Sequence, residues 1–300
     1  MLNTKKVQIL MSTYNGEQYL KEQLDSLISQ THSNIEILVR DDGSTDATVS
    51  IIKEYQKSHQ NLFLFEEENI GLTKSFLNLL GKSEADYVAF SDQDDVWMEN
   101  KIEKALEALE KTEGPALYCS NQVLVDTDLN PLETNAEVPN PKPSFANAVI
   151  ESMCTGCTAV LNKELADNIK AHMPQRAIWH DWWCYLIASY LGVVIFDKNA
   201  YIYYRQHGNN QLGSSRSAFQ MMKNKWDFLK KTRGRLGEQL EDFAKEYHGD
   251  SKKDEMVDLL LASKTSIPAR FKLVFHKEIH RQKPLDNLVV KGLYLFNRML

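Results

Sequence analysis

Apolar positions along the first 125 residues alternate between two spacings. Short apolar runs typical of buried strands occur at 7–14, 35–40, 62–65, 87–90 and 117–125. Between them, apolar residues recur three and four positions apart, which predicts amphipathic helices over 17–30, 46–56, 72–80 and 98–111. Strands that alternate with helices of this length form βαβ units, so the pattern predicts an α/β fold with a mostly parallel central sheet flanked by helices.

The regular alternation stops after residue 125. Several prolines between 131 and 143 predict a surface loop over 126–144. Beyond the loop, the pattern predicts a helix around Ala166, a helix over 180–191 and strands over 193–196 and 201–205. After Gly213 the chain is expected to be helical. We therefore predict a sheet-containing domain over 1–213 and a helical C-terminal extension over 214–300.

The charge of the chain is unevenly distributed. The formal net charge is −6, which is the wrong sign for a broad nucleic-acid binder, so no nucleic-acid partner is expected. Seven Lys/Arg and two Asp/Glu give residues 265–300 a net charge of +5, so the first 264 residues carry −11. The extension therefore ends in a basic segment attached to an acidic body.

The cysteine content and the length of the apolar runs both indicate in which cellular compartment the protein is expected. Four cysteines are too few and too unevenly placed for a disulfide framework. The longest nearly apolar run, 184–196, has thirteen residues, which is short of the ~18–20 needed to cross a bilayer. We therefore expect a cytoplasmic protein whose basic tail can reach the inner face of the cell membrane.

Small polar and acidic residues follow the first four predicted strands, at 12–16, 41–46, 69–71 and 91–95. In an open parallel sheet, ligands bind outside the carboxyl ends of the strands. Helix capping explains about one acid per helix, but Asp92, Asp94 and Asp95 place three carboxylates at one strand end. Such a cluster repels itself unless a cation lies between its members.

The Asp-x-Asp arrangement offers hard oxygen ligands for Mg²⁺ or Mn²⁺. Mg²⁺ in proteins typically takes one or two carboxylates and completes its shell with phosphate oxygens, which points to a metal–diphosphate substrate. The sequence holds neither Gly-x-Gly-x-x-Gly after the first strand nor Gly-x-x-x-x-Gly-Lys-Ser/Thr anywhere. A dinucleotide-dependent dehydrogenase and a P-loop NTPase are therefore disfavoured.

Four motifs, taken together in order and spacing, carry a family resemblance: Met11-Ser-Thr-Tyr-Asn-Gly-Glu17, Asp41-Asp-Gly-Ser-Thr-Asp46, Asn69-Ile-Gly71 and Ser91-Asp-Gln-Asp-Asp-Val-Trp97. They resemble the family 2 glycosyltransferases of the GT-A fold. Gly156-Cys-Thr158, His180-Asp-Trp-Trp183 and Tyr204-Arg-Gln-His-Gly-Asn-Asn210 look most like the bacterial rhamnosyltransferases of surface polysaccharide synthesis. The resemblance covers about residues 5–213 and implies a nucleotide-binding half at about 1–125 and an acceptor half at about 145–213.

The resemblance implies roles for residues of the donor site. Thr13, Tyr14 and Glu17 would line the nucleotide pocket, and Asn69 would also contact the nucleotide-sugar. Asp42 matches the acid that accepts a hydrogen bond from the pyrimidine N3–H, an edge that uracil and thymine share, so UDP and dTDP both stay open.

The resemblance also implies a metal site for Mg²⁺ or Mn²⁺. Asp92 and Asp94 match the pair that places the metal and the ribose, with Asp94 the direct ligand, and Asp95 would orient the sugar. His207 matches a residue that reaches the metal or the diphosphate, and Arg205 would pair with the departing phosphates. A structural, hydrogen-bonded histidine is the alternative for His207.

The resemblance implies that Asp181 is the general base. His180 stands before it where the commonest family pattern has Glu. The acceptor and sugar pocket would include Gly156, Cys157, His180, Trp97, Trp182 and Trp183. As alternatives, Asp181 serves the N-terminal dipole of its helix, and Trp182 and Trp183 are core residues. Cys154-x-x-Cys157 lacks the second pair that a zinc site needs, which favours strand packing.

The implied activity is metal-dependent, inverting transfer of a sugar to a hydroxyl. The expected donor is dTDP-β-L-rhamnose, and the expected acceptor is a saccharide that can be lipid-linked, in cell-surface polysaccharide synthesis. One alternative is the same chemistry with a UDP-hexose or UDP-N-acetylhexosamine donor. The other is a non-catalytic subunit that binds nucleotide-sugars in an assembly complex.

The basic tail combines charge with an amphipathic pattern. Apolar residues recur at helical spacing on one side, namely Leu285, Leu288, Val289, Phe296 and Met299. Residues of the opposite side are Asn287, Lys291, Tyr294 and Arg298. Five basic residues precede them, Arg270, Lys272, Lys277, Arg281 and Lys283. The pattern predicts a helix that binds an anionic membrane surface, or one that packs on the catalytic domain or on a second subunit of a homodimer.

Overall fold

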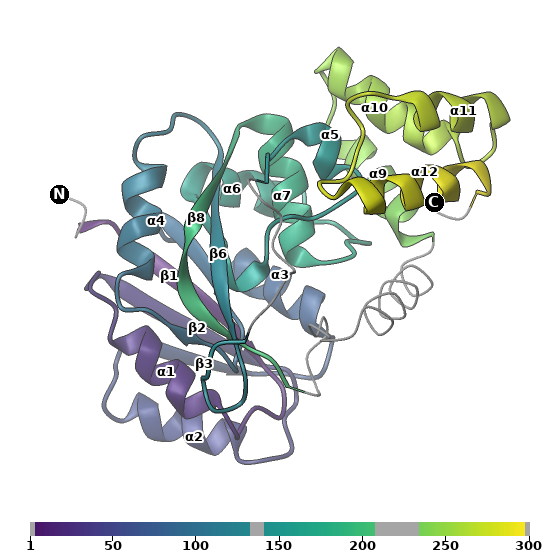
Figure 1. Cartoon of the computed structure of the whole chain (residues 1–300). Helices are drawn as coiled ribbons and strands as arrows, with labels where there is room; N and C mark the ends of the chain where they lie inside the picture. The colour runs from purple at the N-terminus through teal and green to yellow at the C-terminus, as the bar shows by residue number, and fades with distance from the viewer. Residues whose placement is uncertain (1–3, 133–140, 208–233, 298–300) are drawn as a thin grey trace. The chain divides into compact units, whose positions relative to one another are not determined.

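The computed structural model describes residues 4–132, 141–207 and 234–297, which divide into two units (Figure 1). Unit 1 comprises 4–132, 154–171 and 191–207, and unit 2 comprises 141–153, 172–190 and 234–297. The predicted acceptor half, 145–213, is thus divided between the two units. The predicted boundary at residue 213 falls outside the described residues and stays a prediction.

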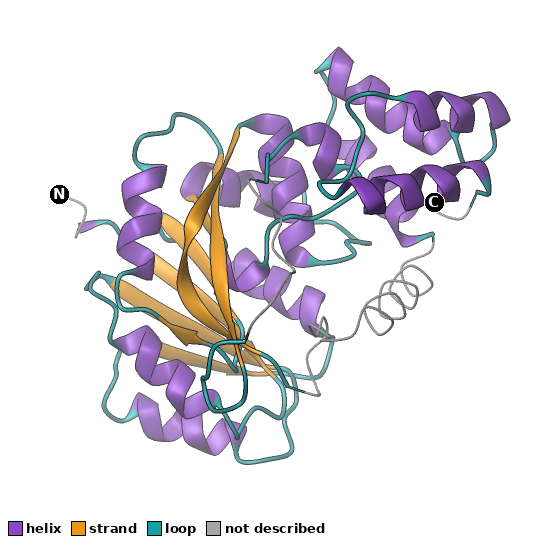
Figure 2. Cartoon of the chain, viewed as in Figure 1, coloured by secondary structure: helices purple, strands orange, loops and turns teal. Residues whose placement is uncertain are grey.

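Unit 1 is built on an eight-stranded sheet with the strand order β3-β2-β1-β4-β7-β6-β8-β5 (Figure 2). The strands are β1 (Val7–Thr13), β2 (Ile35–Asp41), β3 (Leu62–Glu66), β4 (Tyr87–Ser91), β5 (Val96–Trp97), β6 (Ala116–Val125), β7 (Val160–Asn162) and β8 (Val193–Arg205). Strands β1 to β4 are parallel to one another, as predicted. In the register, Thr13 lies opposite Asp41 and Met11 opposite Ser91, so the loops after β1, β2 and β4 leave one edge of the sheet.

The second half of the sheet is mixed. β7 pairs antiparallel with both β4 and β6, and β5 pairs antiparallel with β8, whereas β6 and β8 are parallel. β5 and β7 hold only two and three residues, too few to show an alternating pattern. The two strands predicted at 193–196 and 201–205 form one strand, because register shifts opposite Ser120 and Asn121 accommodate the polar break between them.

Helices cover both faces of this sheet. α1 (Leu20–Ile28), α2 (Thr48–Gln56) and α4 (Lys101–Leu109) place Leu24, Ile52 and Leu106 in one apolar core with the odd-numbered residues of β1. α3 (Leu72–Lys82) contacts β1 and β2, and α6 (Lys163–Ala171) contacts β4 and β7. Leu10 and Phe90 are fully buried, and the Phe90 ring packs edge-on against Phe76 of α3, on the second face.

Unit 2 is helical in its described residues. Its elements are α5 (Phe145–Ala148), α7 (His180–Leu191), α9 (Arg235–Glu246), α10 (Ser251–Ala262), α11 (Ile267–Phe275) and α12 (Pro284–Leu295). Aromatic rings from α5, α7 and the end of α9 pack together, with Phe243 in contact with Phe145, Trp183, Tyr190 and Tyr247. The helical pattern predicted after residue 213 is confirmed over 234–297.

The side of α12 that packs on unit 2 differs from the prediction. Tyr294, assigned from its spacing to the polar side, is only 2% exposed, and Val290 is 1% exposed. Leu285 and Phe296 on the apolar side are 72% and 74% exposed. The predicted residues Met299 and Arg298 lie outside the described part of the chain. Among the described helices, none is both long and apolar enough to cross a membrane.

Candidate active site

The loop after β1 is fastened to the loop after β2. The Thr13 hydroxyl is buried and donates to Asp41 Oδ1 at 2.9 Å. Glu17 Oε2 accepts the Ala47 N–H at 2.8 Å, and Glu17 lies outside α1, which begins three residues later than predicted. Thr13 and Glu17 thus join two loops, while the Tyr14 ring is 50% exposed at the edge where a nucleotide is expected.

Gln93 is the middle residue of the Asp-x-Asp motif. It joins the loop after β1 to the loop after β4, residues 92–95, which we call the acidic loop. Its Oε1 accepts the Tyr14 N–H at 2.8 Å, and its Nε2 donates to the Tyr14 carbonyl at 3.1 Å. A Cβ on Gly16 would lie 2.3 Å from Gln93 Oε1, so this approach requires glycine. Gln93 was not among the predicted site residues, because the Asp-x-Asp motif is defined by the residues on either side of it.

Asp42 organises the loop after β3. Its carboxylate is buried, forms an ion pair with Arg40 Nη1, and accepts the backbone N–H groups of Ile70 and Gly71 at 2.9 and 2.8 Å. Asn69, which the resemblance places at the nucleotide-sugar, lies exposed in this same loop. A carboxylate has about four lone-pair positions, so Asp42 retains capacity for one further donor.

The acidic loop presents two of its three carboxylates to solvent. Asp94 is 20% exposed, and its Oδ2 lies 2.7 Å from Nε2 of His207. Asp92 is also partly exposed, whereas Asp95 is fully buried and accepts the Arg205 backbone N–H at 3.1 Å. Burial raises the pKa of the Asp95 carboxyl well above its usual value, and the charges of Asp94 and Asp92 raise it further.

Arg205 holds the acidic loop in place through hydrogen bonds of its buried guanidinium group. Its side chain is 1% exposed and donates to the Asp94 carbonyl at 2.9 Å, to the Thr127 carbonyl, and to the Glu22 carboxylate. The Tyr19 ring lies 4.4 Å from its guanidinium carbon. In this structure Arg205 holds the loop, and its expected contact with the departing phosphates stays a prediction.

A buried lysine lies beneath the acidic loop. Lys101 of α4 is 1% exposed, and its Nζ lies 3.2 Å from the centroid of the Trp97 ring with no hydrogen-bond partner among the described residues. Burial lowers the pKa of Lys101 to about 7, although the nearby Cys157 and Asp95 favour its charged form. Trp97 is only 3% exposed and belongs to the apolar core, and its expected place at the sugar pocket stays a prediction.

Two groups of donor atoms bear on the expected metal. Atoms of Asp92, Asp95 and Cys157 lie within 4.8 Å of one another, but Asp95 and Cys157 are buried, and burial with the adjacent Asp95 charge raises the pKa of the Cys157 thiol. A protonated, soft sulfur ligand does not suit Mg²⁺ or Mn²⁺. The partly exposed oxygens of Asp92 and Asp94, with His207 beside Asp94, fit such a cation better.

Unit 2 carries the predicted base. Asp181 lies partly buried in the first turn of α7, and its Oδ1 accepts the Trp182 N–H at 2.7 Å. The neighbouring His180 is buried, and burial lowers its pKa to about 3, so its imidazole is neutral. This contact is compatible with either role for Asp181, so the assignment as base stays a prediction.

The remaining predicted pocket residues are buried. Trp183 is fully buried against Phe243, and Trp182 is 5% exposed with its Nε1 donating to the Ala148 carbonyl at 2.7 Å. This burial favours the alternative that Trp182 and Trp183 are core residues, and their place in an acceptor pocket stays a prediction. Gly156 and Cys157 are buried in a short 3₁₀ turn of unit 1, where Cys157 lies near Asp95.

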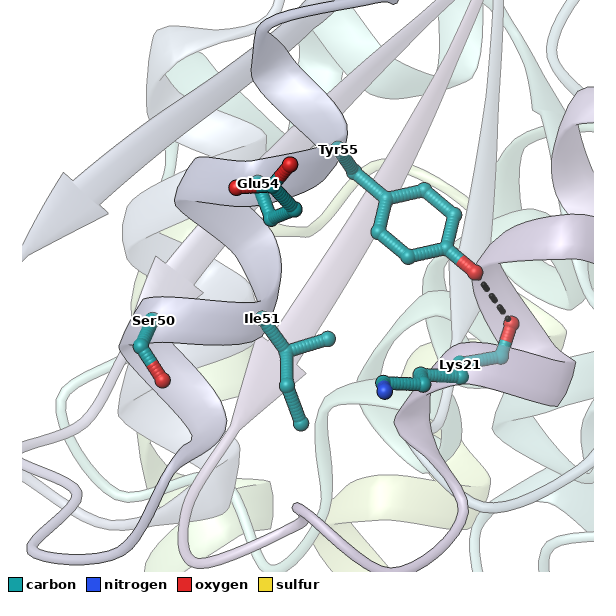
Figure 3. Close-up of a pocket in the computed structure, with 5 residues that line it drawn as sticks. All are labelled: Lys21, Ser50, Ile51, Glu54 and Tyr55. Carbon is teal, nitrogen blue, oxygen red and sulfur yellow. Dashed lines mark hydrogen bonds between the residues drawn. The ribbon is translucent and has the colours of Figure 1, made fainter.

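A cavity of about 330 Å³ lies between α1 and α2 of unit 1 and is lined by none of the predicted site residues (Figure 3). It is lined by Lys21, Ser50, Ile51, Glu54 and Tyr55. The Tyr55 hydroxyl, at 2.7 Å from Asp25 Oδ1 and 3.3 Å from the Lys21 carbonyl, connects α2 to α1 there. The cavity therefore reflects how two helices pack, and the chemistry lies at the strand ends.

Comparison with known proteins gives concordant matches. The sequence model of a family described as "Glycosyl transferase family 2" matches residues 8–170. The dTDP-rhamnosyl transferase RfbG of Shigella flexneri is 32% identical over 236 residues, which cover 72% of this chain and 80% of that protein.

Two solved structures are similar in fold. S. aureus TarS 1–349 in complex with UDP-GlcNAc has a TM-score of 0.61 at 18% identity, covering 98% of this chain and 79% of its own. The mannosyltransferase PcManGT from Pyrobaculum calidifontis, in complex with GDP-Man and Mn²⁺, has a TM-score of 0.56 at 16% identity, covering 98% of this chain and 86% of its own. At these identities the likeness concerns the fold alone.

Proposed function

Because the chain belongs to glycosyl transferase family 2 and has the GT-A fold, we propose that it transfers L-rhamnose from dTDP-β-L-rhamnose to a hydroxyl of a saccharide acceptor, with inversion. The observation that carries this proposal is the Asp94–His207 pair, held at 2.7 Å in an acidic loop at the carboxyl end of β4. The donor assignment is supported by the similarity to the S. flexneri rhamnosyl transferase.

Donor binding would use the loops after β1, β2 and β4. Asp42, already fixed by Arg40 and two backbone N–H groups, would accept the N3–H of the thymine, and the exposed Tyr14 ring would cover the base. Asp92, Asp94 and His207 would hold Mg²⁺ or Mn²⁺, which when bound supplies positive charge against the diphosphate. Arg205 and Gln93 keep the acidic loop in place for this task.

Transfer would proceed by direct displacement. The acceptor hydroxyl oxygen forms a bond to the anomeric carbon while the bond from that carbon to the diphosphate oxygen breaks, and dTDP leaves with the electron pair. Asp181 would take the hydroxyl proton. The sugar passes through a transition state of oxocarbenium character, and inversion of the β-linked donor gives an α-L-rhamnoside. This scheme needs a single carboxylate as base and no nucleophilic second one.

The test is a donor panel with purified full-length protein. Release of nucleoside diphosphate is measured for dTDP-rhamnose, UDP-glucose and UDP-N-acetylglucosamine, each with Mn²⁺ or Mg²⁺ and with excess chelator. We expect turnover of dTDP-rhamnose, lost on chelation and in Asp94→Ala. Turnover of only a UDP-sugar would change the donor assignment from dTDP-rhamnose to that UDP-sugar. The role proposed for Asp42 would remain, because uracil and thymine both present the N3–H. Donor binding without turnover of any member would instead favour the scaffold subunit.

The acceptor follows from the same reasoning at a coarser level. A family 2 enzyme similar to a rhamnosyl transferase would act on a growing surface polysaccharide, whose chains can be lipid-linked. Mass analysis of products formed with a crude lipid-linked saccharide fraction would test this, with a water-soluble oligosaccharide fraction as the comparison.

A further inference from the structure

Two helices of unit 2, α11 and α12, pack against each other (Figure 1). They and the C-cap of α12 expose eight large apolar side chains, which we call the apolar surface: Ile267, Phe271 and Phe275 of α11, with Leu285, Leu288, Val289, Leu295 and Phe296 of α12 and its C-cap. The most exposed members are Phe275 at 77%, Phe296 at 74% and Leu285 at 72%. Single exposed apolar residues are ordinary, but a group of this size on neighbouring helices marks an interaction site.

Each helix is anchored by its other side, so this exposure is not a sign of loose packing. Ala269 and Leu273 of α11 are buried, as are Val290 and Tyr294 of α12. On α11, the exposed residues follow a spacing of four, which places them on one side of the helix. Two amphipathic helices therefore bury a narrow side in unit 2 and present a broad apolar side outward.

The charges around the apolar surface are mostly positive. Residues 266–297 contain six Lys/Arg and two Asp/Glu, a net charge of +4. Glu278 forms an ion pair with Lys252 of α10, and Arg281 forms one with Glu151, both partners lying outside this segment. Lys272, Lys277 and Lys291 have no ion pair among the described residues, and Arg270 donates to the Ser263 and Lys264 carbonyls, which leaves its charge uncompensated. The partner should therefore offer an apolar region to the exposed side chains and negatively charged groups to the lysines beside them.

We propose that α11 and α12 form a docking surface for a lipid bilayer rich in anionic phospholipids. Exposed Phe and Leu side chains enter the boundary between headgroups and acyl chains, while lysines beside them meet the phosphates. A second copy of the chain is a poorer partner, because a two-fold interface uses the same surface of both subunits and would bring two sets of these lysines together. The helices would lie along the membrane surface, and this docking is independent of which sugar is transferred.

The experiment is co-sedimentation of the full-length protein with vesicles of phosphatidylglycerol and phosphatidylcholine, or of phosphatidylcholine alone, at ~0.1 M and ~1 M salt. We expect binding to the anionic vesicles only, weakened by salt. Phe275→Ser with Phe296→Ser should abolish binding, because these two exposed side chains would insert into the bilayer. This double variant should still fold, because neither side chain is part of the core. Lys272→Gln with Lys277→Gln should weaken binding about 30-fold. Phe63→Ser, an exposed phenylalanine of β3 in unit 1, is the matched control and should bind normally.

Three results would overturn the proposal. The wild-type chain could fail to bind anionic vesicles, or Phe275→Ser with Phe296→Ser could bind as well as Phe63→Ser. Light scattering could instead show a dimer that the same double variant dissociates, without vesicle binding, which would assign the apolar surface to a second copy. Circular dichroism of each variant confirms that unit 2 remains folded.

Discussion

The imidazole Nε2 of His207 lies 2.7 Å from Oδ2 of Asp94, although 113 residues separate them. Arg205 is the last residue of β8 and lies two residues before His207. Its side chain donates to the Asp94 carbonyl, so the end of β8 also fixes the loop that carries Asp94. In the proposed donor complex, a cation bound by both groups would supply positive charge against the diphosphate.

Asp94→Ala is expected to lower turnover by more than ~10²-fold, because the diphosphate leaving group loses a positioned electrostatic stabiliser. Steady-state rates with saturating Mn²⁺ measure this. Asp86→Ala is the control: Asp86 lies immediately before β4, at the opposite end of the strand, and its replacement should leave turnover unchanged. Full activity of Asp94→Ala, or of the wild-type enzyme in excess chelator, would exclude a metal-dependent mechanism.

Asp181→Asn separates the two roles open to Asp181. The amide oxygen can still accept the Trp182 N–H, so the start of α7 keeps this hydrogen bond, but the proton acceptor is lost. We expect donor affinity by calorimetry to be unchanged and the transfer rate to fall by ~10²–10⁴-fold. If the rate survives and only thermal stability changes, Asp181 serves the helix and another group is the base.

The strands that hold the site were predictable because their sequences carry enough alternation. β1 and β2 each have seven residues and matched the prediction to within one residue, whereas β5 and β7 have two and three and left no pattern. The antiparallel insertion of β7 between β4 and β6 depends on those three residues. The sequence therefore predicted the parallel half of the sheet together with β6 and β8, but neither β5 and β7 nor the antiparallel pairing that they make.

Burial of individual side chains could not be predicted, because it depends on partners distant in sequence. Arg205 was expected at the phosphates, but its guanidinium meets Glu22, which lies 183 residues earlier. Trp97 was expected in a pocket, but Lys101 of the following helix packs over its ring. Spacing shows which residues share a helix side and does not show which side the rest of the protein covers, as Tyr294 demonstrates.

Asp42→Ala is expected to raise the donor KM for thymidine and uridine nucleotides alike. The lost bond is charge-assisted and is worth about 1.5–3 kcal/mol. Stability should fall as well, because the buried Arg40 loses a carboxylate and the Gly71 N–H loses its acceptor. Glu67→Ala removes a different partner of Arg40 and serves as the control, with a stability loss and an unchanged KM. An unchanged KM in Asp42→Ala would show that the pyrimidine base of the donor binds elsewhere.

Lys101→Met is expected to stabilise the protein most strongly below pH 7. Burial lowers the pKa of Lys101 to about 7, below its ordinary value of 10.5, so between these values the unfolded chain binds a proton that the folded chain does not. The stability of the wild-type protein therefore rises with pH across this window, and the penalty for the buried charge is fully present below pH 7. Methionine has a similar length and no charge, so the advantage of the variant should shrink by about 1.4 kcal/mol for each pH unit above 7. Free energies of unfolding in urea at about pH 6 and about pH 9 measure this difference. An advantage that is equal at both pH values would show that the Lys101 amine keeps its charge in the folded protein across this range.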